Sequence, residues 1–350
     1  MDTTRLGRTD LQVTRTAFGV LPLQRTERNE AIRILRRAYD AGVTFYDTAR
    51  AYTYSESKIG AALSDVRDRI VIATKTGAST RERAMQDIEA SLRELRTDYV
   101  DILQLHNPAP LPAPDDPQSS YAALRELKQQ WKIRFIGATN HSLERALAAL
   151  ASGLYDTIQF PLNYLSSPAD LDLIERCRER DVGLIAMKPL SGGLLTDPKP
   201  VFAFLRQFQN VVPIWGFQHM RELDGLLDLD AHPPELDSAI RKRISRDRRE
   251  LAADFCRACG YCLPCPAEIP IPMAARMPLL LRRMPSQQFM TVDWQEKMGR
   301  IRDCRECGHC RKHCPYGLDT PALLRKALAD YESFRAAELA HMDAGMTPKN

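Results

Sequence analysis

Cysteine is the residue type whose spacing points most directly to chemistry in this 350-residue chain. Eight of its nine cysteines lie in two short runs that share the pattern C-R-x-C-G-x-C followed by Cys-Pro. They are Cys256, Cys259, Cys262 and Cys265 in the first run, and Cys304, Cys307, Cys310 and Cys314 in the second. The second run has the C-x2-C-x2-C-x3-C-P spacing of 4Fe-4S ligands, and the first run is one residue tighter. The sequence therefore predicts metal ligation by thiolates rather than disulfide bonds.

Two 4Fe-4S clusters are the interpretation that this spacing favours. The alternative is a pair of zinc sites with four cysteines each, but zinc ligands normally come as two separated C-x2-C pairs. Three closely spaced thiolates suit three corners of a cubane, and the distant fourth cysteine is often donated to the other cluster. We therefore predict a crossed arrangement, with one cluster held by Cys256, Cys259, Cys262 and Cys314 and the other by Cys304, Cys307, Cys310 and Cys265. The ninth cysteine, Cys177, is predicted to be a small buried apolar residue.

Four polar residues in the first part of the chain could act together on a carbonyl group. Asp47 ends the second strand-like run, Tyr52 follows in the next loop, Lys75 ends the third run and His106 ends the fourth. Taken singly, each has an ordinary structural explanation as a helix cap, a packed ring, a solvated amine or a hydrogen-bonded core histidine. Hydride transfer to a carbonyl group places negative charge on its oxygen, so the reaction needs a proton donor with preorganised partners.

The segments YDTARAY, ATKTG and LQLHNP, which contain these four residues, resemble the aldo/keto reductases. In that family an Asp and, five residues later, a Tyr follow the second strand of a barrel, and Lys and His end the third and fourth strands. We expect Tyr52 to be the acid, Lys75 to lower the pKa of its phenol, Asp47 to hold Lys75, and His106 to orient the carbonyl oxygen. With the cysteine runs, the chain resembles iron-sulfur members that carry a fused ferredoxin-like domain.

The resemblance also implies a nicotinamide nucleotide, NAD(P)H, as a cofactor. The residues expected to bind it are Thr139, Asn140, Gln159, Met187, Leu190 and Gly192. The first three would hold the carboxamide, and the methionine stands where the family usually stacks an aromatic ring on the nicotinamide. The last two lie in the segment MKPLSGG, whose backbone would cradle the pyrophosphate.

The chain departs from the family pattern after the eighth strand-like run. There the family presents a basic residue for the 2′-phosphate and a Glu-Asn pair for the adenine, whereas this chain reads WGFQHMRELDGLL. Gly225 and Leu226 replace the pair, and only His219 and Arg221 offer charge. We therefore expect nucleotide binding to be weak and to show little selection for NADPH.

The elements that must position these residues alternate between short apolar, β-branched runs and amphipathic helical runs. Strand-like runs begin near residues 18, 44, 69, 100, 134, 157, 183 and 211. Eight strand-helix units of this length favour a (β/α)8 TIM barrel over an open doubly wound sheet. The N-terminal segment TTRLGRTDLQV predicts a hairpin that caps the bottom of the barrel, and the Pro-rich residues 107–120 predict a long loop over its mouth.

A change in composition near residue 235 predicts a boundary between the barrel, residues 1–235, and a mainly helical ferredoxin-like domain, residues 236–350. The second segment holds 20 Lys and Arg against 14 Asp and Glu, and two anionic clusters would offset much of this excess. Residues 241–250 predict a solvated helical face, and residues 266–303 predict short helices.

The sequence contains no stretch resembling a membrane span or a secretion signal. No window approaches the roughly 18 to 20 apolar residues that a membrane span needs, and the N-terminal residues lack the apolar core of a signal peptide. We therefore predict a cytoplasmic protein with a small-molecule substrate, no membrane span and no nucleic-acid partner.

The leading hypothesis is an oxidoreductase of the aldo/keto reductase type that acts on a carbonyl or alcohol group and transfers electrons through two 4Fe-4S clusters. Hydride carries two electrons and each cluster passes one, so coupling them needs a flavin, a radical, or both clusters acting together. A redox partner such as ferredoxin or a flavoprotein is expected. One alternative is an electron-transfer protein whose barrel binds a ligand or partner without NAD(P)H-dependent carbonyl reduction. Another is that the clusters are structural.

Overall fold

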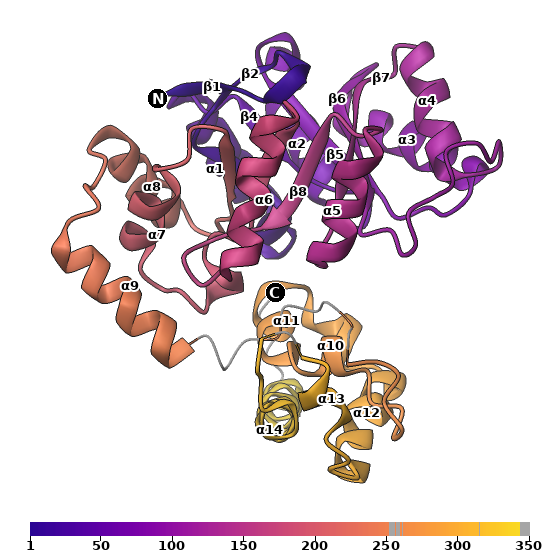
Figure 1. The fold of residues 1–350 in the computed structure, drawn as a ribbon, viewed down its shortest axis with the longest axis vertical. Coiled ribbons are helices and arrows are strands. Elements are labelled where there is room, and N and C mark those ends of the chain that lie inside the picture. The colour runs from indigo at the N-terminus through magenta and orange to yellow at the C-terminus, as the bar shows by residue number, and fades with distance from the viewer. Residues whose placement is uncertain (252–255, 257–259, 261, 315, 344–350) are drawn as a thin grey trace. The chain divides into compact units, whose positions relative to one another are not determined.

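A closed barrel of eight parallel strands forms the first part of the chain in the computed structural model of the protein (Figure 1). The structure describes residues 1–251, 256, 260, 262–314 and 316–343 and divides into two units, Met1–Arg241 and Lys242–Asn350. The strands, in their order around the ring, are β10 (Val211–Trp215), β3 (Ala17–Gly19), β4 (Phe45–Asp47), β5 (Val71–Thr76), β6 (Val100–His106), β7 (Ile133–Thr139), β8 (Thr157–Pro161) and β9 (Gly183–Met187). The predicted (β/α)8 barrel is confirmed. Because the strands are parallel, their C-terminal ends meet at one face.

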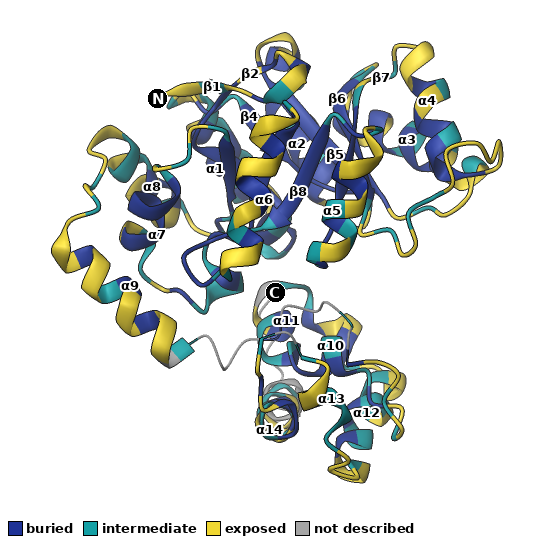
Figure 2. Cartoon of the chain, in the orientation of Figure 1, coloured by how far each residue is buried: buried dark blue, intermediate teal, exposed yellow. Residues whose placement is uncertain are grey.

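A helix follows each strand of the barrel. These helices are α1 (Arg28–Asp40), α2 (Ser55–Leu63), α3 (Arg81–Leu95), α4 (Ser120–Gln129), α5 (Leu143–Ser152), α6 (Pro168–Glu179), α7 (Pro198–Leu205) and α8 (Met220–Ala231). Side chains cap several of them: Thr80, Ser119 and Ser142 accept hydrogen bonds from the first turns of α3, α4 and α5. Figure 2 shows the apolar faces of these helices buried and their opposite faces exposed. The amphipathic patterns of the sequence thus predict these elements.

The N-terminal hairpin closes the barrel at the end where the strands begin. Its strands β1 (Thr3–Arg5) and β2 (Gln12–Thr14) pair antiparallel. Leu6, Leu11 and Val13 are buried in one apolar cluster with residues of β3, β4, β5, β6, β9 and β10. A Cβ atom on Gly183, the first residue of β9, would lie only 2.7 Å from Cγ of Leu6. The hairpin therefore fills this end of the barrel with apolar side chains.

The Pro-rich segment after β6 is a loop that ends where Ser119 caps α4. The first residue of the loop, Asn107, donates a backbone hydrogen bond of 3.1 Å to the carbonyl of Thr139 at the end of β7. The loop thus leaves the barrel beside the C-terminal ends of β6 and β7.

Helices around a small apolar core make up the second unit, which is mainly helical as predicted; those within residues 266–303 are short, whereas the last helix has 24 residues. They follow α9 (Ser238–Leu251) and are α10 (Ile271–Ala274), α11 (Met277–Arg283), α12 (Val292–Gly299), α13 (His309–Lys312) and α14 (Thr320–Asp343). Met277, Leu281 and Met298 are among the fully buried residues of this core, and most described cysteines of the two runs pack in it or against it. None of the described cysteines forms a disulfide bond.

Candidate functional site

Three polar side chains at the ends of neighbouring strands meet at the C-terminal face of the barrel. Asp47 ends β4, Lys75 lies near the end of β5, and His106 ends β6. The ammonium of Lys75 donates hydrogen bonds to Oδ1 of Asp47, at 2.5 Å, and to the carbonyl of Thr48, at 2.6 Å. Both Asp47 and Lys75 are buried. Asp47 and Lys75 therefore form a buried ion pair with a fixed position in this part of the site.

Tyr52 reaches this ion pair from the loop after β4. Its ring stands edge-on to the imidazole of His106, with 5.6 Å between the ring centroids. The ammonium of Lys75 lies 5.2 Å from the centre of the Tyr52 ring. The structure thus brings together all four residues that the sequence singles out for carbonyl chemistry.

The expected lowering of the Tyr52 pKa by Lys75 is wrong for this structure. The pKa of Tyr52 is raised, first by burial of the phenol and second by the negative charge of Asp47. The ammonium of Lys75 is already bound to Asp47 and Thr48 and lies over the face of the ring, so the charges of the pair offset each other. Tyr52 therefore remains protonated through the neutral pH range, as a proton donor must.

Two glutamines hold the carboxylate of Asp47: Gln104, which sequence reasoning missed, and Gln159, which it assigned to the nicotinamide carboxamide. Gln104 donates to Oδ2 at 3.1 Å, and Gln159 donates to Oδ1 at 3.4 Å. Burial raises the pKa of Asp47 and lowers that of Lys75, whereas the ion pair and these hydrogen bonds favour the charged carboxylate. In the sequence, Gln104 reads as one more residue of an alternating strand, with no local signal that its amide serves Asp47.

The loop that carries Tyr52 is anchored by a second buried carboxylate, which the sequence analysis also missed. Glu56, on α2, is 1% exposed and accepts a hydrogen bond of 2.7 Å from Oγ1 of Thr74, the neighbour of Lys75. Its other oxygen pairs with Arg50, two residues before Tyr52 in the loop. Thr48 donates to Ser55 at 2.8 Å across the base of the same loop. Glu56 thus ties the Tyr52 loop to the strand that bears Lys75.

His106 is expected to stay neutral well below the usual pKa of histidine. Burial lowers its pKa to about 3, and the positive charges of Lys75 and Lys188 act in the same direction. The signal of His106 is assigned as the imidazole resonance that is absent from the spectrum of His106→Gln. In an NMR titration of the holoprotein, this resonance should not shift between about pH 8 and 5.5. A titration of this resonance near pH 6.5 would contradict the expectation.

The lowered pKa of His106 also makes the stability of the folded protein depend on pH. Because the folded-state pKa lies below that of the unfolded chain, the unfolded state binds more protons at mildly acidic pH. The stability contributed by neutral His106 is therefore present above about pH 6.5 and is lost as the pH falls towards 3.

The residues expected to hold a nicotinamide carboxamide lie beside this centre. Thr139 ends β7, Asn140 follows it, and Gln159 lies in β8, all three buried. Oε1 of Gln159 is a buried acceptor without a hydrogen-bond partner among the described residues. A buried acceptor left unpaired is costly, and an amide N–H of a bound ligand would satisfy it. Met187, at the end of β9, is 8% exposed and buried in the apolar core.

The segment after β9 forms a tight backbone turn. Lys188, Ser191, Gly192 and Gly193 all have positive φ, and Gly193 donates a backbone hydrogen bond of 2.8 Å to the carbonyl of Leu190. Asn163, another residue missed in the sequence, donates to Oγ of Ser191 at 2.8 Å. A turn with consecutive left-handed residues turns backbone N–H groups to one side and suits an anion such as pyrophosphate.

The start of α8 has few groups that could bind the adenine end of a nucleotide. The carboxylate of Glu222 accepts the backbone N–H groups of Gln218 and His219 and so caps the helix. Leu226 is buried, whereas Arg221 and Gly225 are exposed, and a Cβ at Gly225 would meet nothing within 4 Å. The geometry supplies no amide or carboxylate at these two positions for an adenine ring.

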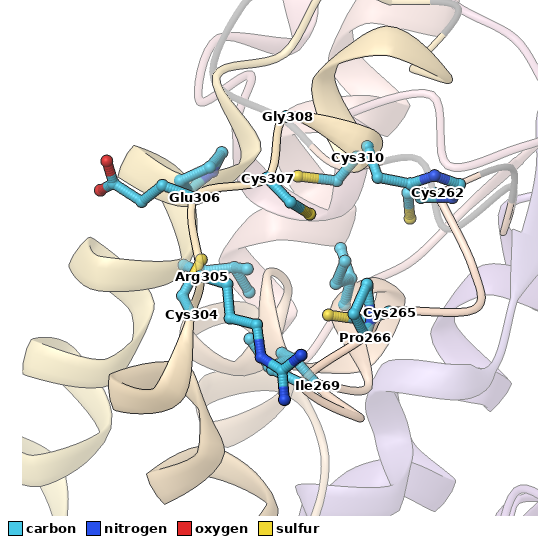
Figure 3. A pocket seen from close by; sticks show the side chains of 15 residues that line it. Cys262, Cys265, Pro266, Ile269, Cys304, Arg305, Glu306, Cys307, Gly308 and Cys310 are labelled. Carbon is cyan, nitrogen blue, oxygen red and sulfur yellow. The ribbon is translucent and has the colours of Figure 1, made fainter.

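The cysteine runs of the second unit line two cavities, a larger and a smaller one. The larger is lined by Cys262, Cys265, Cys304, Cys307 and Cys310, and the smaller by Cys256, Cys262 and Cys314. Figure 3 shows the sulfur atoms of Cys265, Cys307 and Cys310 pointing towards one space. Cys265 therefore lies with the second run and Cys314 with the first, which is the placement that the crossed arrangement requires. Cys259 lies outside the described residues.

The residues present fit a 4Fe-4S cluster. Seven described cysteines border the two cavities, and thiolates are the ligands of such clusters. Among the described residues, no three Cys, His, Asp or Glu side chains gather closely enough to hold a single metal ion. Cys177 is fully buried on α6, and burial raises its pKa to about 12, so it is an apolar core residue as predicted.

Two family profiles match the chain. The profile of the aldo/keto reductase family matches residues 15–222, and that of a 4Fe-4S dicluster domain matches residues 255–319. Among the described residues, no helix is long and apolar enough to cross a membrane.

Curated relatives resemble the barrel part of the chain. L-galactose dehydrogenase of Arabidopsis thaliana is 33% identical over 214 residues, which are 56% of this chain and 67% of that protein. NADH-specific methylglyoxal reductase of Escherichia coli is 28% identical over 221 residues, which are 55% of this chain and 68% of that protein. The chain thus spans about two thirds of the length of these relatives.

Solved structures share the fold. An aldo-keto reductase from Bacillus halodurans in its holo form superposes with a TM-score of 0.59 at 23% identity, over 70% of this chain and 96% of that one. An aldo/keto reductase from Klebsiella pneumoniae in complex with NADP and acetate gives a TM-score of 0.57 at 23% identity, over 70% of this chain and 94% of that one.

Proposed function

Because this chain belongs to the aldo/keto reductase family, we propose that its barrel reduces the carbonyl group of a small molecule, or oxidises the corresponding alcohol, with Tyr52 as the proton donor. The observation that carries this proposal is the convergence of Tyr52, His106 and the buried pair of Asp47 and Lys75 at the C-terminal face of the barrel. Names of two relatives, a dehydrogenase of L-galactose and a reductase of methylglyoxal, support a small carbonyl or alcohol substrate.

In this reaction the residues of the chain manage the charge that forms on the carbonyl oxygen. Neutral His106 orients the oxygen by a hydrogen bond, and Tyr52 gives its proton to the alkoxide as the charge develops. The ammonium of Lys75, fixed by Asp47, then stabilises the phenolate that remains. An alkoxide is more basic than a phenolate, so a Tyr52 with a raised pKa can still be an effective donor.

A bound nicotinamide nucleotide would supply or accept the hydride. We propose that Thr139, Asn140 and Gln159 hold its carboxamide, that Met187 lies against its ring, and that backbone near Leu190 and Gly192 holds its pyrophosphate. The unpaired Oε1 of Gln159 and the turn after β9 support this placement.

Two 4Fe-4S clusters held by the eight cysteines of the two runs would pass single electrons. The dicluster family profile and the two cysteine-lined cavities support them. One electron from each cluster would match the two electrons of a hydride, and a redox partner such as ferredoxin or a flavoprotein would exchange them one at a time.

Turnover by the anaerobically purified holoprotein tests the proposal. We would follow nicotinamide absorbance with NADH and methylglyoxal, and with NAD⁺ and L-galactose, since the relatives act on these compounds. Turnover that requires the barrel residues supports carbonyl chemistry. The absence of turnover with these and a wider panel of aldehydes and ketones would favour an electron-transfer protein whose barrel only binds a ligand. The observation that supports this second function is the exposed Gly225 on α8, which stands where the family has a residue for the adenine.

Nucleotide binding is expected to be weak and nearly indifferent to the 2′-phosphate. At the start of α8 only Arg221 and His219 offer charge, and no Glu-Asn pair faces the adenine position. In calorimetric titrations of the holoprotein, the Kd values for NADH and NADPH should differ by less than about tenfold, or about 1.4 kcal/mol. Binding of NADPH more than about a hundredfold tighter than NADH would show that another part of the chain recognises the phosphate.

A further inference from the structure

A histidine between two cysteines of the second run has a buried nitrogen that points to a role in the larger cavity. His309 lies on α13 between Cys307 and Cys310 and lines the cavity with five cysteines. Its Nε2 atom is buried and has no hydrogen-bond partner among the described residues. An unpaired buried polar atom destabilises the fold, so such an atom in a native structure calls for a group that completes the site.

The ring of His309 is held in place by its neighbour one turn later. The imidazole of His313 packs against it with 4.2 Å between ring centroids and 34° between the ring planes. Nδ1 of His313 donates a hydrogen bond of 2.8 Å to the backbone carbonyl of His309. The two contacts restrict the ring, so the position of Nε2 is a property of the folded site and not of a freely turning side chain.

The two cavities also differ in exposure to solvent. Cys256, which lines only the smaller cavity, is 9% exposed, whereas Cys307, which lines only the larger cavity, is exposed. A cluster in the larger cavity would therefore lie nearer the surface of the second unit. Exposure and hydrogen bonds to the sulfur atoms are two of the factors that set the reduction potential of a 4Fe-4S cluster.

We infer that His309, through Nε2–H, donates a hydrogen bond to a sulfur atom of the 4Fe-4S cluster in the larger cavity and thereby raises the reduction potential of that cluster. The inference rests on the proposed clusters. Reduction adds one electron from the redox partner to the cluster, and no bond forms or breaks. The proton stays on the imidazole, where its hydrogen bond strengthens as the sulfur atoms become more negative. The exposed cluster would then be the one that accepts electrons first.

Potentiometric titration of the holoprotein, followed by electron paramagnetic resonance at one fixed pH, tests this inference. In His309→Leu, one of the two cluster potentials should fall by about 59 mV, a tenfold weaker reduction, while the other stays unchanged. His309→Gln keeps a donor group and should restore part of the shift. His313→Phe is the matched control, because it removes the neighbouring imidazole but keeps an aromatic ring packed against His309, and it should shift neither potential appreciably.

The outcomes separate this inference from the proposal that it rests on. If the protein as isolated holds zinc or lacks 4Fe-4S signals, the proposed clusters fail before any variant is tested. If both clusters are present and His309→Leu leaves both potentials unchanged, the hydrogen bond is refuted while the clusters stand. An equal shift in His313→Phe would also overturn it. If His309→Leu does not assemble the cluster, the reduction potentials of His309→Gln are compared with those of the wild type. Glutamine is the weaker donor, so two unchanged potentials in this variant would contradict the inference.

Discussion

Replacement of Tyr52 by phenylalanine is expected to lower the rate of carbonyl reduction by about 10²- to 10⁴-fold and to leave the fold and the iron content unchanged. The substitution removes only the hydroxyl of a ring that lies beside His106 and Lys75. The aromatic ring remains to pack against His106. The measurement is a single-turnover rate with prebound nucleotide and the carbonyl compound that proves active, at saturating concentration.

A second tyrosine in the same loop provides the control. Tyr54 is 65% exposed, so Tyr54→Phe makes the same chemical change two residues away without touching the site. It should turn over at the wild-type rate. Circular dichroism and iron analysis check that both variants fold and hold their clusters. Near-normal turnover by Tyr52→Phe would show that the proton comes from elsewhere, and the barrel would then be better explained as a ligand-binding domain.

Cys314→Ala is expected to remove about half of the iron, from roughly eight atoms per chain to roughly four, and the cluster lost should be that of the first cysteine run. The reason is the placement of Cys314 in the smaller cavity, with Cys256 and Cys262, although in sequence it belongs to the second run. Iron and sulfide analysis gives the loss, and the reduction potential of the surviving cluster identifies it.

Cys265→Ala is the reciprocal variant. Cys265 lines the larger cavity with the second run, so its loss should affect the other cluster. If the cluster that survives in Cys314→Ala is the one unaffected by His309→Leu, the crossed assignment is wrong. Zinc in place of iron in the wild-type protein would refute both the clusters and the crossing.

Patterns that depend on near neighbours in the chain made the fold predictable. Strand and helix periods show in windows of a few residues, and all eight barrel strands lie in the predicted runs. The positions of Asp47, Lys75 and His106 follow from the same patterns, because residues that end parallel strands of a barrel must share one face. The crossed placement of Cys265 and Cys314 rests on known cluster geometry.

What the sequence could not show depends on contacts between distant residues. The pKa of Tyr52 is raised and not lowered, first by burial of the phenol and second by the charge of Asp47, and no local pattern shows that burial. Glu56 reads as an ordinary polar residue on a helix until the fold buries it against Thr74. His309 reads as a spacer between cysteines until the fold places it in the lining of the cavity, with a buried Nε2 that has no partner among the described residues.

The N-terminal hairpin also limits the direction from which the phenolate of Tyr52 can be reprotonated. Leu6, Leu11 and Val13 fill the end of the barrel where the strands begin, so the C-terminal face is the side from which water can approach the phenol. In the proposed reaction, product bound at that face would separate the phenolate from solvent. Product would then have to leave before Tyr52 takes up the next proton, which would give each catalytic cycle a fixed order at its end.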